Sequence, residues 1–91
     1  MVKAEDIVQI IKECFLKNDR GFPLKIDTDL LQEGICDSLK LVTLAVEVES
    51  RYKPLKILDQ EIKRDNFSSA EKILNFLKVK GLEVEDAEDF K

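Results

Sequence analysis

Apolar residues recur at helical spacing in three separate stretches of this 91-residue chain, and this pattern limits the fold more than any other sequence feature. Residues three or four positions apart share one face of a helix, so each stretch predicts a helix with an apolar face. The first helix is predicted for about residues 3–17 and the second from residue 37 or 38 to about 52. The third begins at a capping box, in which Ser68 precedes Glu71 by three positions, and ends near residues 80–81.

The segments between these helices are a long connection, residues 18–34, and a shorter one after Pro54. Turn-forming residues at 18–21 and Pro23 argue against a helix in the long connection. It is nevertheless too apolar for a solvated loop, so we expect it to cross the bundle and bury its apolar side chains, with a short helical turn at 28–32. Those side chains are Phe22, Leu24, Ile26, Leu30 and Leu31. One or two helical turns are expected at 59–64.

These elements predict an all-α fold, a small four-helix bundle of three major helices and one short helix with a long first loop. The chain is long enough for one domain. We assign that domain to residues 1–80. Residues 81–91 form an acidic tail with no clear period, which we expect to be partly disordered.

Charge and composition exclude several classes of function. The net charge is −4, which disfavours nucleic-acid binding and favours partners with basic surfaces. No apolar run is long enough for a membrane span and the N-terminus is not a secretory signal, so we expect a cytoplasmic monomer. The chain has no histidine and no metal-binding motif, which argues against an enzyme.

Cys14, on the apolar stripe of the first helix, is interpreted as a buried hydrophobe.

Residues 29–39 form the one segment that is suited to carry chemistry. They place Ser38 at the start of a predicted helix, after Gly34 and directly after Asp37. The unpaired N–H groups of a first helical turn favour a phosphate ester there, and Asp37 adds a charge that could position a metal ion or a basic partner during modification. Taken by itself, however, the Asp-Ser pair is also typical of a helix cap.

The sequence Gly34-Ile35-Cys36-Asp37-Ser38-Leu39, with the apolar helix that follows it to Tyr52, resembles the acyl and peptidyl carrier protein family. In that family an Asp-Ser-Leu triplet opens the second helix and its serine carries 4'-phosphopantetheine. Further similarities lie in the approach at residues 29–31, in Ile57 and Asp59, and in the turn at 66–70, so the resemblance covers about residues 2–79. The spacing between Gly34 and Asp37 is closer to D-alanyl and stand-alone peptidyl carriers than to fatty-acid carriers.

The resemblance implies a non-catalytic carrier. A phosphopantetheinyl transferase would attach the arm to Ser38 from coenzyme A, with Asp37 in a supporting role. A ligase or synthase would load an acyl or aminoacyl group as a thioester, and downstream transferases would receive it, in fatty-acid or secondary-metabolite biosynthesis. The alternative function is a helical adaptor that binds a partner through its second helix and has no prosthetic group.

The second helix carries the remaining candidate residues. It is apolar on more than one side, so it is either central or meets a partner. Leu39 and Val46 are candidate partner contacts, with core packing as an equal alternative. Glu47 is a candidate docking residue, although a solvated charge is the simpler interpretation. Cys36 stands where the resembling sequences have an aliphatic residue, so we interpret it as buried and inert.

Overall fold

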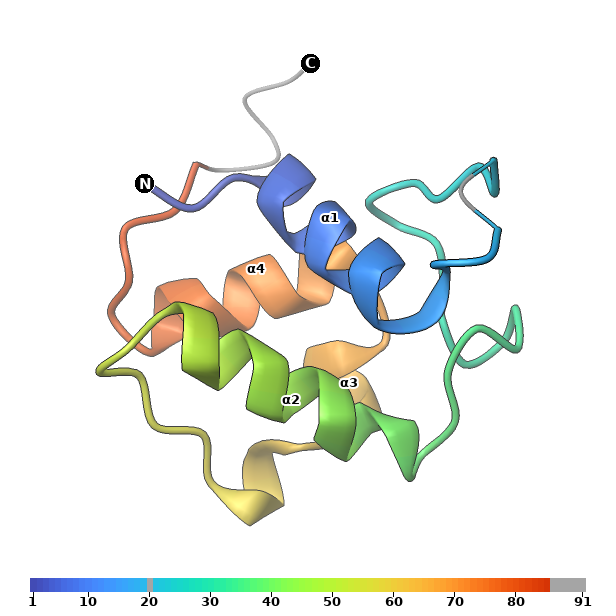
Figure 1. Cartoon of the computed structure of the whole chain (residues 1–91). Helices are drawn as coiled ribbons and strands as arrows, with labels where there is room; N and C mark the ends of the chain where they lie inside the picture. Colours follow the sequence, from blue (N-terminus) through green and yellow to red (C-terminus); the bar gives the residue numbers. More distant parts are fainter. Residues whose placement is uncertain (20, 86–91) are drawn as a thin grey trace.

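All regular elements in the described part of the chain are helices (Figure 1). The computed structural model describes residues 1–19 and 21–85. These contain α1 (Ala4–Phe15), α2 (Lys40–Arg51), a 3₁₀ turn η1 (Asp59–Glu61), the short α3 (Arg64–Phe67) and α4 (Ala70–Val79). The predicted all-α fold of three major helices and one short helix is confirmed.

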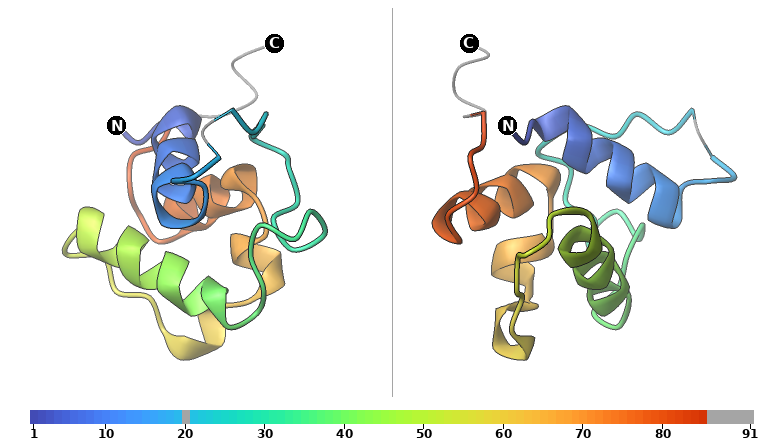
Figure 2. Two further views of the ribbon diagram at one scale, coloured as in Figure 1. Left: turned by 45° about the vertical axis from the view of Figure 1, so that its right-hand side comes forward. Right: turned by 60° about the vertical axis from the view of Figure 1, so that its left-hand side comes forward.

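The helices surround one apolar core. α1 packs on α2 and α4, and α3 packs on α4 and α2. In all three views α1 lies at one side of the molecule, and the segment from α2 to α3 lies at the opposite side (Figures 1 and 2). The predicted apolar stripes meet in this core, which buries Ile7, Ile10, Ile11, Leu44, Val48, Ile73, Leu74 and Leu77 completely or nearly so.

The long first loop lies against this core, as predicted. Leu30 is fully buried, and Leu24, Ile26 and Leu31 pack partly against the core. The backbone holds the loop to the start of α4, because the Leu30 N–H donates to the Ser68 carbonyl (2.7 Å) and the Glu71 N–H donates to the Ile26 carbonyl (2.8 Å). The loop is therefore part of the folded body, and its path determines where α2 begins.

The helical turn expected at 28–32 is present, but it lies slightly later in the chain, at residues 30–34. The Glu33 N–H donates to the Asp29 carbonyl (3.0 Å), which is the hydrogen bond of one α-helical turn. The Asp29 carboxylate accepts hydrogen bonds from the Leu31 and Gln32 N–H groups, both 3.0 Å long. An aspartate side chain that binds the N–H groups two and three residues later is the usual arrangement at the start of a helical turn, and Gly34 with its positive φ ends the turn.

The start of α4 also differs from the prediction. Ser69, not Ser68, caps this helix, since its hydroxyl accepts from the Lys72 N–H (3.2 Å). Ser68 is buried, and its carbonyl is the acceptor for Leu30. The two adjacent serines are equivalent candidates in the sequence, and the loop contact made by Ser68 distinguishes them.

The predicted end of α4 is confirmed. Gly81 has a φ of +102°, a conformation that glycine adopts readily. The Gly81 N–H donates to the Lys78 carbonyl and the Leu82 N–H to the Leu77 carbonyl. This pair of hydrogen bonds satisfies carbonyl groups at the helix end that would otherwise lack a partner.

The one or two helical turns predicted at 59–64 are confirmed in part. Asp59–Glu61 form a 3₁₀ turn that begins where predicted, whereas α3 begins only at Arg64 and continues through Asn66 and Phe67. Phe67 is fully buried, with its ring centroid 5.2 Å from that of Phe76 on α4. This aromatic contact is tertiary, so local sequence signals did not predict the extent of α3.

Part of the predicted tail pairs with the N-terminus. The Val2 N–H donates to the Glu83 carbonyl (2.9 Å) and the Glu85 N–H donates to the Val2 carbonyl (2.8 Å), which forms an isolated parallel bridge between Val2 and Val84. Residues 86–91 of the tail lie outside the described residues. No helix within the described part of the chain is long and apolar enough to cross a membrane.

The two faces of α2 predict different mutational costs. Leu44 is fully buried and Val46 is 60% exposed. We expect Leu44→Ala to lower the free energy of unfolding by about 2–5 kcal/mol, because it leaves a cavity in the core. Val46→Ala, on the same helix, should change it by less than about 0.5 kcal/mol. Urea denaturation followed by circular dichroism measures both values, and equal effects of the two substitutions would contradict the assigned orientation of α2.

Candidate functional site

Asp37 caps α2. The helix begins at Lys40, slightly later than predicted, and Ser38 and Leu39 form the turn that leads into it. The Asp37 carboxylate accepts from the Lys40 N–H (2.8 Å), and the Asp37 carbonyl accepts from the Leu41 N–H (3.1 Å). A side-chain oxygen that binds the N–H three residues later is the usual arrangement of a helix N-cap. The cap interpretation of this pair is therefore correct for Asp37.

Ser38 has no part in the cap. Its side chain is exposed, and no hydrogen bond joins its hydroxyl to any residue within 1–19 or 21–85. Asp37 satisfies the N–H of Lys40, so the hydroxyl beside it is left available to an incoming group. The pair is thus divided into a structural aspartate and an unengaged serine.

The segment before Asp37 is fixed to the core. The Leu30 carbonyl accepts from the Ile35 N–H (3.0 Å) and the Cys36 N–H (3.1 Å). Gly34, with a φ of +74°, reverses the chain between Leu30 and Ile35. Its N–H donates to the Leu31 carbonyl. A positive φ is costly for residues with a side chain, which explains a glycine here. This bonded turn determines where Asp37 and Ser38 emerge at the surface.

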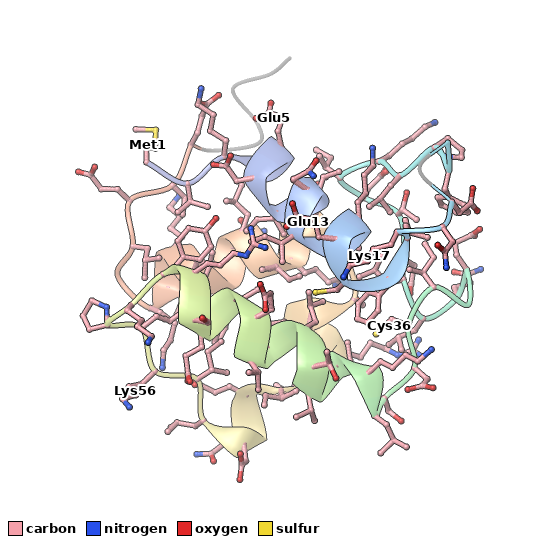
Figure 3. The ribbon with its side chains drawn as sticks, in the orientation of Figure 1. Met1, Glu5, Glu13, Lys17, Cys36 and Lys56 are labelled. Carbon is pink, nitrogen blue, oxygen red and sulfur yellow. The ribbon has the colours of Figure 1, made fainter. Side chains whose placement is uncertain are left out.

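Cys36 points into the molecule just before the site (Figure 3). Its side chain is 4% exposed, and its Sγ donates to the Asp37 carbonyl (3.3 Å). Burial, reinforced by the neighbouring Asp37 carboxylate, raises the pKa of this thiol to about 11. The thiolate is the reactive form, so Cys36 is unreactive near neutral pH. The predicted burial of Cys36 is confirmed.

Cys14 is only half-buried, packed against the core from α1. Desolvation raises the pKa of its thiol, and the Glu47 carboxylate raises it further.

An apolar ridge runs along the exposed side of α2. Leu39 is 82% exposed, Val46 60% and Val42 48%. Their spacing of three and four positions places them on one helix face. The predicted second apolar face is therefore present, and core packing does not account for Leu39 or Val46. Sequence reasoning did not select Val42 as a contact residue, although its spacing from Leu39 and Val46 was the available signal.

Glu47 belongs to a charged cluster between α1 and α2. The Arg51 Nε donates to Glu47 Oε1 (2.9 Å), and the Arg51 guanidinium also binds Glu13 of α1. Hydrogen bonds from Gln9 and Arg51 lower the pKa of the Glu13 carboxyl. These pairs are largely exposed, so each stabilises the fold only slightly. Glu47 is thus not a freely solvated charge, because its carboxylate is occupied by Arg51.

Comparison with curated proteins gives relatives over most of the chain. The chain is 37% identical to a D-alanyl carrier protein of Streptococcus thermophilus over 73 residues. This match covers 80% of the chain and 86% of the relative. D-alanyl carrier proteins of Streptococcus sanguinis and Streptococcus suis are 34% and 35% identical over 73 and 71 residues, and the matches cover 86% and 85% of those proteins. No family model matches the chain, and no solved structure matches it significantly.

The chain belongs to the family of phosphopantetheine-binding carrier proteins. It holds cargo on a 4'-phosphopantetheine arm, and as a carrier protein it is not itself an enzyme. The family resemblance seen in the sequence is confirmed. The adaptor alternative, which has no prosthetic group, is therefore set aside.

The geometry around Ser38 fits such an arm. An ester on Ser38 would break no hydrogen bond among the described residues and would displace no buried side chain, because the hydroxyl is exposed and unengaged. The N-terminal end of α2 lies next to it and offers a partial positive charge to a phosphate. When bound, the arm supplies a thiol that holds cargo as a thioester.

The cap itself is testable. We expect Asp37→Ala to lower the free energy of unfolding by about 1 kcal/mol, because the Lys40 N–H loses its acceptor. Asp37→Asn keeps an oxygen at the same place and should leave stability nearly unchanged, since Asn and Asp cap helices about equally well. Urea denaturation compares the three proteins. An equal loss in both variants would show that charge rather than the hydrogen bond is responsible.

Proposed function

We propose that Ser38 is the attachment point of the arm and that the chain carries an aminoacyl group, D-alanine. The observation that supports the attachment most directly is the exposed Ser38 hydroxyl, which has no partner among the described residues and lies in a turn held by Asp37. A serine that served as the cap would have to give up its own hydrogen bond on modification. Here the cap and the modified group are different residues.

Attachment transfers the phosphopantetheine group from coenzyme A to Ser38. The Ser38 oxygen bonds to the phosphorus that bears the pantetheine chain, the pyrophosphate bond of coenzyme A breaks, adenosine 3',5'-bisphosphate departs as the leaving group, and the hydroxyl proton passes to a base of the transferase. Asp37 supports this step by holding the first turn of α2 in one geometry. The partial positive charge at the start of α2 favours the phosphate that remains on Ser38.

The relatives favour D-alanine as the cargo. The curated proteins that match across four-fifths of this chain are named as D-alanyl carriers. These matches agree with the spacing of Gly34 and Asp37 and support aminoacyl loading. The comparisons give no support for the fatty-acid or secondary-metabolite pathways expected from the broader family.

Docking to the loading ligase and to downstream transferases is proposed for the exposed side of α2. Leu39 and Val46, together with Val42, form the ridge that a partner would cover, and Glu47 lies on its flank in contact with Arg51. A docked carrier raises the local concentration of its cargo at the partner's active site. We also propose a monomer in the cytoplasm, a reducing compartment in which two free cysteines are expected.

The attachment site is tested by intact-mass measurement. After incubation with coenzyme A and a broad-specificity phosphopantetheinyl transferase, the wild-type chain should gain the mass of one arm. Ser38→Ala should gain none. Ser50→Ala removes another exposed hydroxyl of α2 and should be modified like the wild type. Modification of Ser38→Ala would refute the assignment of Ser38.

The cargo is tested on the modified protein. A D-alanine-activating ligase from the source organism, with ATP, should add one D-alanyl group to the chain. Because a thioester is far more labile to hydroxylamine than an amide, neutral hydroxylamine should release this group. L-alanine and a fatty acid serve as competing substrates, and preferential loading of either one would overturn the D-alanine assignment.

A further inference from the structure

Two aspartates hold the segment that carries Ser38, one at each end. Asp37 caps α2 from the position directly before Ser38. Asp29 stands at the other end and is half-buried, and one of its carboxylate oxygens accepts from the N–H groups of Leu31 and Gln32, both at 3.0 Å. Asp29 therefore does for the turn that follows it what Asp37 does for α2.

The Asp29 carboxylate orients one peptide group that is bonded on both sides. The carbonyl of Leu30 and the N–H of Leu31 belong to the same trans peptide, which is planar, so the two point in opposite directions. Asp29 holds the N–H (3.0 Å), and the carbonyl accepts from the N–H groups of Ile35 (3.0 Å) and Cys36 (3.1 Å). Rotation of this plane would disturb all three bonds together. The Asp29 side chain thus directs the carbonyl that fastens the chain just before the attachment point.

The part of the loop before this peptide is fastened separately. The Leu30 N–H donates to the Ser68 carbonyl (2.7 Å), and the Thr28 Oγ1 accepts from the Lys25 N–H (2.9 Å). Thr28 and Asp29 are adjacent, yet the Thr28 side chain closes a turn that lies before it and the Asp29 side chain a turn that lies after it. A change at Thr28 therefore affects residues before the Leu30 anchor, whereas a change at Asp29 affects the segment that leads to the attachment point.

The residues of the attachment site have little packing of their own to hold them. Asp37 and Ser38 are exposed, so their position depends on the bonded segments on either side. We propose, on the basis of the attachment at Ser38 proposed above, that Asp29 is a positioning residue for that step. Through the Leu30–Leu31 peptide its carboxylate holds the Ser38 hydroxyl where the transferase can align it with the phosphorus of coenzyme A. Misplacement of a reacting atom by about 1 Å can lower a rate by about 100-fold.

The test compares Asp29→Ala and Asp29→Asn with the control Thr28→Val. Asp29→Ala removes the acceptor of the Leu31 and Gln32 N–H groups, whereas Asp29→Asn keeps an oxygen at the same place. Thr28→Val removes the acceptor of the Lys25 N–H in the same loop and hardly changes the side-chain volume. Circular dichroism checks that each variant folds. If Asp29→Ala does not fold, Asp29→Glu takes its place, because it keeps the charge and only displaces the carboxylate.

The measurement is the rate of arm attachment by the broad-specificity transferase, resolved into kcat and the KM for the carrier. We expect Asp29→Ala to lower kcat by about tenfold with little change in KM, because Ser38 is misplaced while the exposed side of α2 is unaltered. Asp29→Asn should keep the wild-type rate, since Asn and Asp cap about equally well. Thr28→Val should keep it too. A charge contact between Asp29 and the transferase would instead be lost in Asp29→Asn as well.

Cys36 reports on the turn without the transferase. Its N–H binds the Leu30 carbonyl, and its side chain is 4% exposed. Local opening of the turn would expose the thiol, so we expect dithiobis(nitrobenzoate) to label Cys36 several times faster in Asp29→Ala than in the wild type. Thr28→Val should be labelled at the wild-type rate. Cys14→Ala in all of these proteins removes the other thiol.

Three results would overturn the proposal. They are an attachment rate for Asp29→Ala equal to that of the wild type, a fall that Asp29→Asn or Thr28→Val reproduces, and a fall without faster labelling of Cys36. Failure of the wild-type chain to gain an arm is a separate result. It would overturn the assignment of Ser38, while the labelling of Cys36 would still show whether Asp29 holds the turn.

Discussion

The buried position of Leu30 is the constraint on which the rest of the structure depends. Its side chain fills the core, its N–H binds the Ser68 carbonyl at the start of α4, and its own carbonyl binds two N–H groups of the following turn. A buried backbone group without a partner is costly, so these bonds hold the loop in one path. That path buries Cys36 and places the next two residues, Asp37 and Ser38, at the surface.

From this point outward, adjacent residues have different roles. Cys36 packs inward and is chemically inert, Asp37 stabilises the helix, and Ser38 is free to be modified. This division leaves the Ser38 hydroxyl unengaged in a turn that is held in place by the Asp37 cap. α2 is divided in a similar way, since Leu44 and Val48 hold it to the core and the opposite side exposes the apolar ridge. Ser38 lies in the turn that leads into α2, so the proposed attachment point and the apolar ridge are both positioned by the core.

The predictions that were confirmed depend on the helical spacing of apolar residues and on a glycine that ends a helix. The stripe of α1, the glycine at the end of α4 and the two apolar sides of α2 follow from spacing alone. The errors arose where a distant contact decided between local alternatives. Ser69 caps α4 because Ser68 binds the first loop, and α3 extends to Phe67 because its ring packs against Phe76. Glu47 and Arg51 are four residues apart, the spacing at which an ion pair forms within a helix. The second ion pair of Arg51 is with Glu13 on α1, and no local spacing predicts it.

The sequence by itself determined the helical class, the number of major helices and the Asp-Ser segment that marks a carrier protein, because these depend on residues close together in the chain. It left open which of Asp37 and Ser38 caps α2, and whether Leu39 and Val46 lie in the core or at the surface. Only the tertiary structure separated them. The exposure of these side chains depends on which distant segments pack against α2, and no local pattern contains this information.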